Sequence, residues 1–162
     1  MDKVLLEQKI ERAFVDFKTA IQQHTDINKK RADGGWSVGE IADHIVKGTQ
    51  VDLSITQKKV RPYDQHAASI KDLFLNSQLK FPTAPILQPE LKHYSIGELF
   101  ALLDVNKGAV LSMIEKDDLT ETCSVIELPV WGTLTKYEWL VLFENHIIRH
   151  TKQINDFSKV VA

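Results

Sequence analysis

Three short segments of the chain each combine a helix-capping residue with a glutamate three positions later. They lie at residues 37–40, 95–98 and 135–138, with Ser, Ser and Thr at the cap and Glu closing each box. In such a capping box the hydroxyl accepts from the third helical amide, and the glutamate reaches back to the amide of the cap. A hydrophobic residue stands directly before and directly after each box, which is typical of a hydrophobic staple. The sequence therefore predicts three helix starts.

Apolar residues recur at helical spacing after each box and also near the start of the chain. The four sets that share a helical face are Leu6, Ile10, Ala13, Phe14, Phe17 and Ile21; Ile41, His44, Gly48, Val51 and Ile55; Ile96, Leu99, Phe100, Leu103, Val110 and Ile114; and Trp139, Leu142, Phe143, His146, His150, Ile154 and Phe157. A chain of 162 residues, 43% of them apolar, can bury one core without a disulfide or structural metal. We therefore predict an all-α fold, a four-helix bundle, as a single domain over residues 1–162.

The connection between the second and third predicted helices is the longest and least regular. It covers residues 62–93 and holds four prolines, with a short helix expected near residues 67–77. The last connection contains a β-branched stretch at residues 122–126, which favours an extended strand. Two long connections leave the bundle topology open. The similar segments WSVGEI and YSIGEL raise the alternative of an internal duplication, although such caps also arise independently.

Charge and hydropathy argue against several classes of partner. The chain has 20 basic and 22 acidic residues, and a net charge of −2 provides no field for nucleic acid. The longest apolar runs have five residues, far fewer than a membrane span needs. The first residues lack the apolar core of a signal peptide, and the single cysteine, Cys123, cannot close an internal disulfide. We expect a cytoplasmic protein.

Three histidines stand on the predicted inward faces. His146 and His150 are four residues apart and therefore share one helical face, while His44 occupies a matching place on the second helix. Together they could supply a three-nitrogen metal site with an open coordination position, as catalytic zinc sites have. The alternative is that they are core histidines bonded to backbone carbonyls, waters or each other, because buried imidazoles need partners. The residues alone leave both interpretations open.

Three segments resemble the DinB/YfiT-like superfamily. WSVGEIADHI resembles the W-S-x-x-E-x-x-x-H motif that opens its second helix, and residues 128–154 resemble its closing segment with H-x-x-x-H followed by Gln. Residues 80–89 resemble the proline-containing crossover of its DinB-like branch. The resemblance implies a four-helix bundle that holds a divalent metal through His44, His146 and His150. Three imidazoles suit zinc or nickel, and also iron or copper, so we expect a divalent transition metal, zinc or nickel first. The resemblance also implies a homodimer.

The resemblance leaves two classes of function. Characterised relatives include metal-dependent transferases that activate a low-molecular-weight thiol, and others are labelled hydrolases. An enzyme of this kind would bind a thiol or water at the open metal position and present it to a small electrophilic substrate. The alternative is a metal- or ligand-binding helical bundle without turnover, acting in a stress response through a partner. The three histidines are expected only as metal ligands, and no residue is assigned a catalytic role.

Several other side chains are candidates with a simpler explanation beside the functional one. Glu40 could orient a ligand or act as a general base, but its capping box already explains it. Arg149 could hold an anionic substrate, but an exposed arginine is favoured. Gln153 could orient His150 or simply pack between helices, and Trp131 could line a pocket. Cys123 is interpreted as a small buried apolar group. Surface positions are expected for His24, His66 and His93, and staple or core positions for Trp36 and Trp139.

Overall fold

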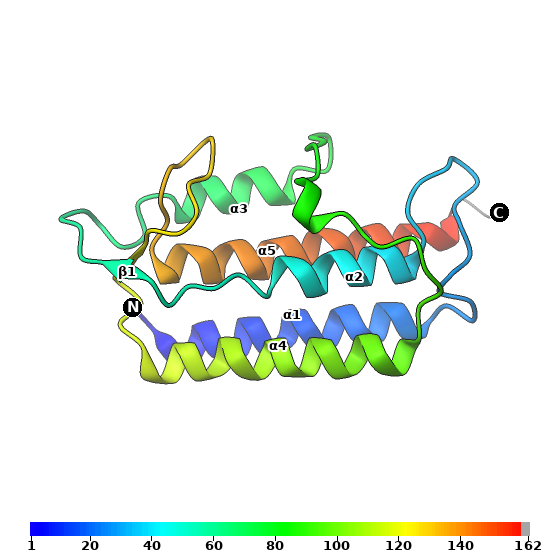
Figure 1. Cartoon of the computed structure of the whole chain (residues 1–162), viewed down its shortest axis with the longest axis horizontal. Coiled ribbons are helices and arrows are strands. Elements are labelled where there is room, and N and C mark those ends of the chain that lie inside the picture. Colours follow the sequence, from blue (N-terminus) through cyan, green and yellow to red (C-terminus); the bar gives the residue numbers. More distant parts are fainter. Residues whose placement is uncertain (160–162) are drawn as a thin grey trace.

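The computed structural model describes residues 1–159 and is mainly α-helical (Figure 1). The α-helices are α1 (Lys3–Gln22), α2 (Val38–Gly48), α3 (Ala67–Leu75), α4 (Ile96–Lys116) and α5 (Lys136–Asn155), and two 3₁₀ segments span Pro85–Leu87 and Asp156–Lys159. Two short strands, β1 (Thr56–Gln57) and β2 (Thr122–Cys123), pair antiparallel. The four predicted helices correspond to α1, α2, α4 and α5, and the predicted short helix in the crossover corresponds to α3.

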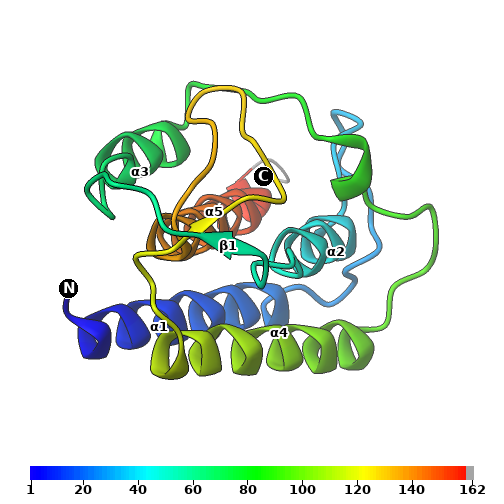
Figure 2. The same ribbon diagram turned by 60° about the vertical axis from the view of Figure 1, so that its left-hand side comes forward.

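The helices are arranged in layers. Helices α1 and α4 lie side by side in one layer, and α2 and α5 lie over them in a second (Figures 1 and 2). Helix α3 packs on the outer side of α5. None of the helices within residues 1–159 combines the length and the apolar character that a membrane span requires.

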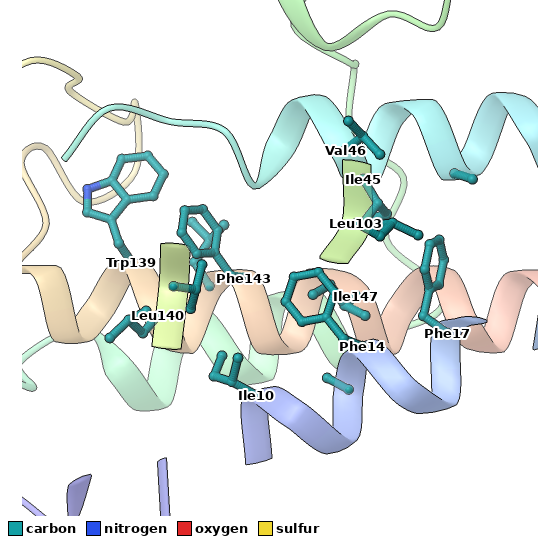
Figure 3. Packing of buried hydrophobic residues seen from close by; sticks show 14 of the residues in the cluster. Ile10, Phe14, Phe17, Ile45, Val46, Leu103, Trp139, Leu140, Phe143 and Ile147 are labelled. Atoms are coloured by element: carbon teal, nitrogen blue, oxygen red, sulfur yellow. The ribbon is translucent and has the colours of Figure 1, made fainter. Parts of the chain in front are cut away.

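Apolar side chains from α1, α2, α4 and α5 fill the space between the two layers (Figure 3). The largest fully buried side chains include Phe14 and Phe17 of α1, Leu103 of α4 and Phe143 of α5. Burying each such side chain contributes about 1.5–3 kcal/mol, which makes this cluster the main source of stability. Most residues of the inward stripes read from the sequence therefore lie in the core of the fold, whereas Ile55 and Ile96 are exposed.

Capping explains where most of these helices begin. The full capping box forms at α2, between Ser37 and Glu40, and at α5, between Thr135 and Glu138. At α4 only the hydroxyl half forms within the described part of the chain, where Ser95 accepts from the Glu98 amide at 3.5 Å. The start of α1 has a cap that sequence analysis did not identify, the carboxylate of Asp2, which accepts from the Leu5 amide.

The second helix is shorter than predicted. The periodicity that continues through Val51 and Ile55 predicts a longer helix, but α2 ends at Gly48 and the chain then runs extended into β1. The last carbonyls find partners outside the helix: Val46 accepts from the Asn106 amide at 2.9 Å, and Ile45 accepts from the Thr49 hydroxyl at 2.8 Å. These bonds satisfy the carbonyls at the helix end. The prediction that the helix continues through Val51 and Ile55 is therefore wrong.

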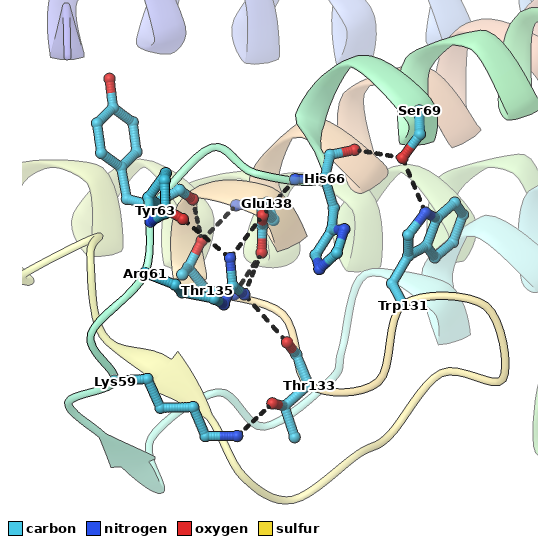
Figure 4. A network of polar contacts seen from close by, with 10 residues as sticks. Lys59, Arg61, Tyr63, His66, Ser69, Trp131, Thr133, Thr135 and Glu138 are labelled. Atoms are coloured by element: carbon cyan, nitrogen blue, oxygen red, sulfur yellow. Dashed lines mark hydrogen bonds and ion pairs between the residues drawn. The ribbon is translucent and has the colours of Figure 1, made fainter.

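The chain that enters α3 is fastened to the start of α5 by a network of polar contacts (Figure 4). Arg61 forms an ion pair with the fully buried Glu138, at 2.7 Å between Nη2 and Oε2. The Thr135 hydroxyl donates to the Tyr63 carbonyl at 2.6 Å, and the backbone amide of His66 donates to Glu138 at 2.7 Å. The same glutamate therefore caps α5 and anchors the crossover.

Candidate metal centre

Three histidines from α2 and α5 converge where these two helices pack. The Nε2 atom of His146 lies 2.9 Å from Nε2 of His44 and 3.1 Å from Nε2 of His150. The possible ligand atoms of all three lie within 4.8 Å of one another. His44 and His146 are buried, and His150 is partly buried. The structure therefore brings together the three residues that the sequence singled out.

Hydrogen bonds on the far side of two rings fix which nitrogen is free. His44 Nδ1 lies 2.8 Å from the carbonyl oxygen of Leu87, and His150 Nδ1 lies 2.7 Å from the amide oxygen of Gln153. An oxygen acceptor requires that Nδ1 carries the proton, so that Nε2 of each ring presents a lone pair. The prediction that Gln153 orients His150 is confirmed by this contact.

One of these Nε2 lone pairs has no N–H group from which to accept a hydrogen bond. Both free Nε2 lone pairs point at Nε2 of His146, and a neutral imidazole carries one proton in total. His146 can therefore satisfy at most one neighbour by hydrogen bonding. Two nitrogens bound at about 2.0–2.1 Å to one ion lie about 2.8–3.4 Å apart, which matches the observed separations. Three imidazoles suit zinc, nickel, copper or iron, so this donor set fits a divalent transition metal.

The surroundings keep the three imidazoles neutral. Burial lowers the pKa of His44 below its ordinary value. Burial together with the neighbouring His150 and His44 holds the pKa of His146 well below 6.5. Burial, reinforced by His44, lowers the pKa of His150 to about 3. Neutral imidazoles are the form that binds metals, so the cluster needs no deprotonation near pH 7 to bind one.

The metal-free protein is expected to lose stability as the pH falls below about 6.5. The unfolded chain takes up a proton on each imidazole near that pH, whereas the lowered pKa of each imidazole in the folded chain delays this uptake, so the unfolded state binds more protons. The free energy of unfolding should therefore fall by up to about 1.4 kcal/mol per pH unit for each histidine. Urea unfolding across this range measures the slope, and a His150→Gln variant should lose one proton's share of it. If the free energy of unfolding of that variant falls with pH as steeply as that of the wild type, the lowered pKa of His150 is contradicted.

Aromatic rings surround the cluster. The Trp36 ring centroid lies 5.1 Å from that of His44, and the Phe74 centroid lies 5.4 Å from that of His146. Gly48 permits the close approach of α5, because a Cβ atom there would lie 3.3 Å from Cε1 of His146. Gly48 lies on the inward stripe predicted from the sequence, but its role in this contact was not predicted. The signal was a helical glycine one turn from His44.

The alternative predictions have different outcomes. Glu40 forms the capping box with Ser37 and an ion pair with Lys30, so the capping explanation is confirmed. Burial opposes its ionisation, but hydrogen bonds from Lys30 and from the Ser37 amide outweigh burial and lower its pKa. The exposed position predicted for Arg149 is wrong. Its half-buried guanidinium donates to three carbonyls of the crossover, those of Phe74, Asn76 and Leu79.

The remaining candidates lie outside the cluster. Trp131 donates from Nε1 to the Ser69 hydroxyl at 2.9 Å, in the outer network of Figure 4. Cys123 is buried in β2, and burial raises the pKa of its thiol to about 11, which makes it a poor nucleophile. His93 is exposed as predicted, and His24 and His66 are partly buried.

Fold and site together define the class of protein: a mainly α-helical chain with a candidate three-histidine metal centre between two packed helices. The DinB superfamily model matches residues 11–154, a span that contains all three histidines. The chain belongs to the DinB superfamily, and the resemblance seen in its sequence motifs is confirmed. No curated protein and no solved structure matches the chain.

Proposed function

We propose that this chain binds one divalent transition metal, zinc or nickel, through Nε2 of His44, His146 and His150. The observation that carries the proposal is the convergence of two oriented Nε2 lone pairs on the Nε2 atom of a third, neutral imidazole. Burial disfavours protonation of these rings, because protonation would make them charged. A shared metal ion is therefore a better partner for the free lone pairs than added protons are. Membership of the DinB superfamily also supports it.

We further propose that the protein is an enzyme that acts on a small electrophilic substrate with a low-molecular-weight thiol or water. Bound metal would supply Lewis acidity, lowering the pKa of a thiol or water in its open position. The histidines would hold the geometry, with His44 fixed by Leu87 and His150 by Gln153. Trp36 and Phe74 would limit the access of water from two sides.

A binding module without turnover is the second candidate. It is favoured by the state of Glu40, the carboxylate that sequence analysis considered as a base. Both of its oxygens are engaged, by the Lys30 ammonium and by the Ser37 amide at 2.7 Å. A base already engaged by two donors is poorly placed to take a proton from a substrate. Without Glu40 as a base, turnover would depend on the reactivity that the metal alone gives to a bound thiol or water.

The same proposal covers the architecture and setting of the protein. Helices α1, α2, α4 and α5 would form the family's four-helix bundle, with residues 1–162 as one cytoplasmic domain. The protein would act as a homodimer, the commonest symmetric assembly. Light scattering at micromolar concentration is expected to give twice the chain mass of 18.5 kDa, and a monomeric mass would refute the dimer.

Metal analysis of protein purified without a His-tag or a chelating column tests the central claim. About one equivalent of transition metal per chain is expected. A screen of thiol cosubstrates against electrophiles, in metal-loaded and metal-free protein, then separates the two candidates. Metal-dependent consumption of the electrophile supports the enzyme, whereas stoichiometric metal without turnover supports the binding module. A wild-type protein that holds no metal and takes up neither zinc nor nickel refutes the metal site and the metal-dependent enzyme, and leaves a bundle that binds another ligand.

A further inference from the structure

The acceptor that orients His44 comes from outside its own helix. It is the Leu87 carbonyl, at the end of the 3₁₀ segment Pro85–Leu87, in the stretch of chain that leads to α4. We call residues 85–94 the strap. A backbone carbonyl fixes the orientation of an imidazole only as well as its own chain segment is fixed. What holds the strap to α2 therefore determines how well His44 is oriented.

Two charged side chains of α2 on either side of His44 hold the strap. Lys47, three residues after His44, donates from Nζ to the carbonyl of Gln88 at 2.7 Å. Asp43, the residue before His44, accepts at Oδ2 from the backbone amide of Glu90 at 3.1 Å. Asp43 and Lys47 also pair with each other at 3.0 Å, and the Asp43 side chain is only 7% exposed. Together they bind the residues that directly follow Leu87.

The far end of the strap is fixed as well. The Tyr94 hydroxyl donates to the Glu90 carbonyl at 2.6 Å and lies 3.2 Å from Asp43 Oδ2. Its ring packs on Gly39 of α2 so closely that a Cβ atom there would lie 2.9 Å from it. The side chain of Asn28 bonds both the amide and the carbonyl of Tyr94. Because this end is anchored, the contacts of Asp43 and Lys47 with Glu90 and Gln88 limit how far the strap can move near Leu87.

We propose that Asp43 and Lys47 are positioning residues for the metal centre, which hold the Leu87 carbonyl on His44 Nδ1 and so keep His44 Nε2 unprotonated. This proposal rests on the proposed function, in which that Nε2 atom is a ligand. Without the carbonyl, the proton can move to Nε2, and the ring can turn away from His146. Hydrogen-bonding partners of metal-binding histidines are typically worth about 10–100-fold in metal affinity.

Lys47 variants should disturb the fold least, because Lys47 lies in the last turn of α2 and its side chain is 23% exposed. Lys47→Met keeps the stem and removes the ammonium, and Lys47→Arg restores a cation. Asp43→Ala removes the other contact. Glu40→Gln is the matched control, because Glu40 is also a buried carboxylate of α2 with a lysine partner, yet it bonds the helix start and not the strap.

Two readouts are needed. Nitrogen chemical shifts of the His44 imidazole in metal-free protein report its tautomer, and zinc competition with a chelator reports affinity. We expect the Nδ1–H tautomer in the wild type and in Lys47→Arg. Lys47→Met and Asp43→Ala should show a mixture of tautomers and about tenfold or more weaker zinc binding. Glu40→Gln should unfold at lower urea concentration but keep the wild-type tautomer and affinity.

The outcomes separate this proposal from the proposed function. If the wild type binds neither zinc nor nickel, the metal site is refuted, and the tautomers of the metal-free variants alone decide whether Asp43 and Lys47 position His44. If the wild type binds zinc and both variants keep the wild-type tautomer and affinity, the positioning role is refuted. An equal loss of affinity in Glu40→Gln also overturns it, because the effect would then follow helix stability.

Discussion

His150→Ala is expected to abolish stoichiometric metal binding, and His146→Ala is expected to do the same. Each variant removes one of three nitrogens, and the two imidazoles that remain bind a divalent ion much more weakly than three do. The loss should exceed the roughly 100-fold that hydrogen-bonding partners of such ligands are worth. Zinc titration with a chelating indicator, together with metal analysis of the purified variants, measures it.

The control for this prediction is a histidine outside the cluster. His24 is also partly buried, but its ring packs edge-on against Phe157 in the 3₁₀ segment that follows α5. His24→Ala should therefore keep one equivalent of metal. Full retention in both His146→Ala and His150→Ala would show that the three rings are core histidines, which is the alternative that sequence analysis left open.

Helical periodicity predicted the cluster because it fixes which residues share a face. Four residues of an α-helix advance by slightly more than one turn, so His146 and His150 must project to the same side. His44 was placed by the same logic on a second inward stripe. The two stripes pack on each other in the structure and bring His44 to His146, with their Nε2 atoms 2.9 Å apart, while Nε2 of His150 lies 3.1 Å from that of His146 within α5.

Helix ends were less predictable because partners distant in the sequence decide them. The stripe of α2 continues through Val51 and Ile55, yet the helix stops at Gly48. The amide of Asn106, 60 positions away, takes the Val46 carbonyl that the next turn of helix would have used. Nothing in the local sequence indicates that contact.

Arg149 illustrates the same limit for a side chain. Its place beside His150 suggested an exposed residue, since neighbours in a helix point about 100° apart. The structure instead covers it with the crossover, whose carbonyls at Phe74, Asn76 and Leu79 surround the guanidinium. The Phe81 ring lies 5.0 Å from the same group. An irregular segment with four prolines has no periodicity from which such a path could be predicted.

Glu138→Gln is expected to lower the free energy of unfolding by about 3–5 kcal/mol. Each oxygen of this fully buried carboxylate accepts two hydrogen bonds. Oε1 accepts from Arg61 Nη1 at 3.0 Å and from the His66 amide at 2.7 Å, and Oε2 accepts from Arg61 Nη2 at 2.7 Å and from the Thr135 amide at 2.9 Å. A glutamine has one oxygen, so its NH₂ group must face two donors whichever way it turns.

The electrostatics of the site add to this cost. Burial opposes ionisation of Glu138, but the Arg61 guanidinium and the amides of Thr135 and His66 outweigh burial and lower its pKa. The folded protein therefore holds a carboxylate at pH 7, and Arg61, whose side chain is 15% exposed, depends on it as a counter-ion. Removing one partner of a buried pair leaves the other charge uncompensated, which is more costly than losing both.

Glu98→Gln provides a matched control, because Glu98 holds the same third position in α4 but is exposed. It should change the free energy of unfolding by no more than about 0.5 kcal/mol, as surface substitutions usually do. Urea unfolding at pH 7 compares the two variants. If Glu138→Gln is as mild as Glu98→Gln, the buried ion pair does not stabilise the fold.

The network also separates the stability of the fold from the binding of metal. Glu138 fixes residues 61–66 at the start of α3, whereas Arg149 fixes the turn after it, next to the Phe74 ring that contacts His146. In the folded fraction of Glu138→Gln, the second anchor is intact and His146 keeps its surroundings. Zinc affinity measured well below the unfolding midpoint should therefore remain that of the wild type. A parallel loss of stability and affinity would mean that the whole of α3, and not only its last turn, supports the metal centre.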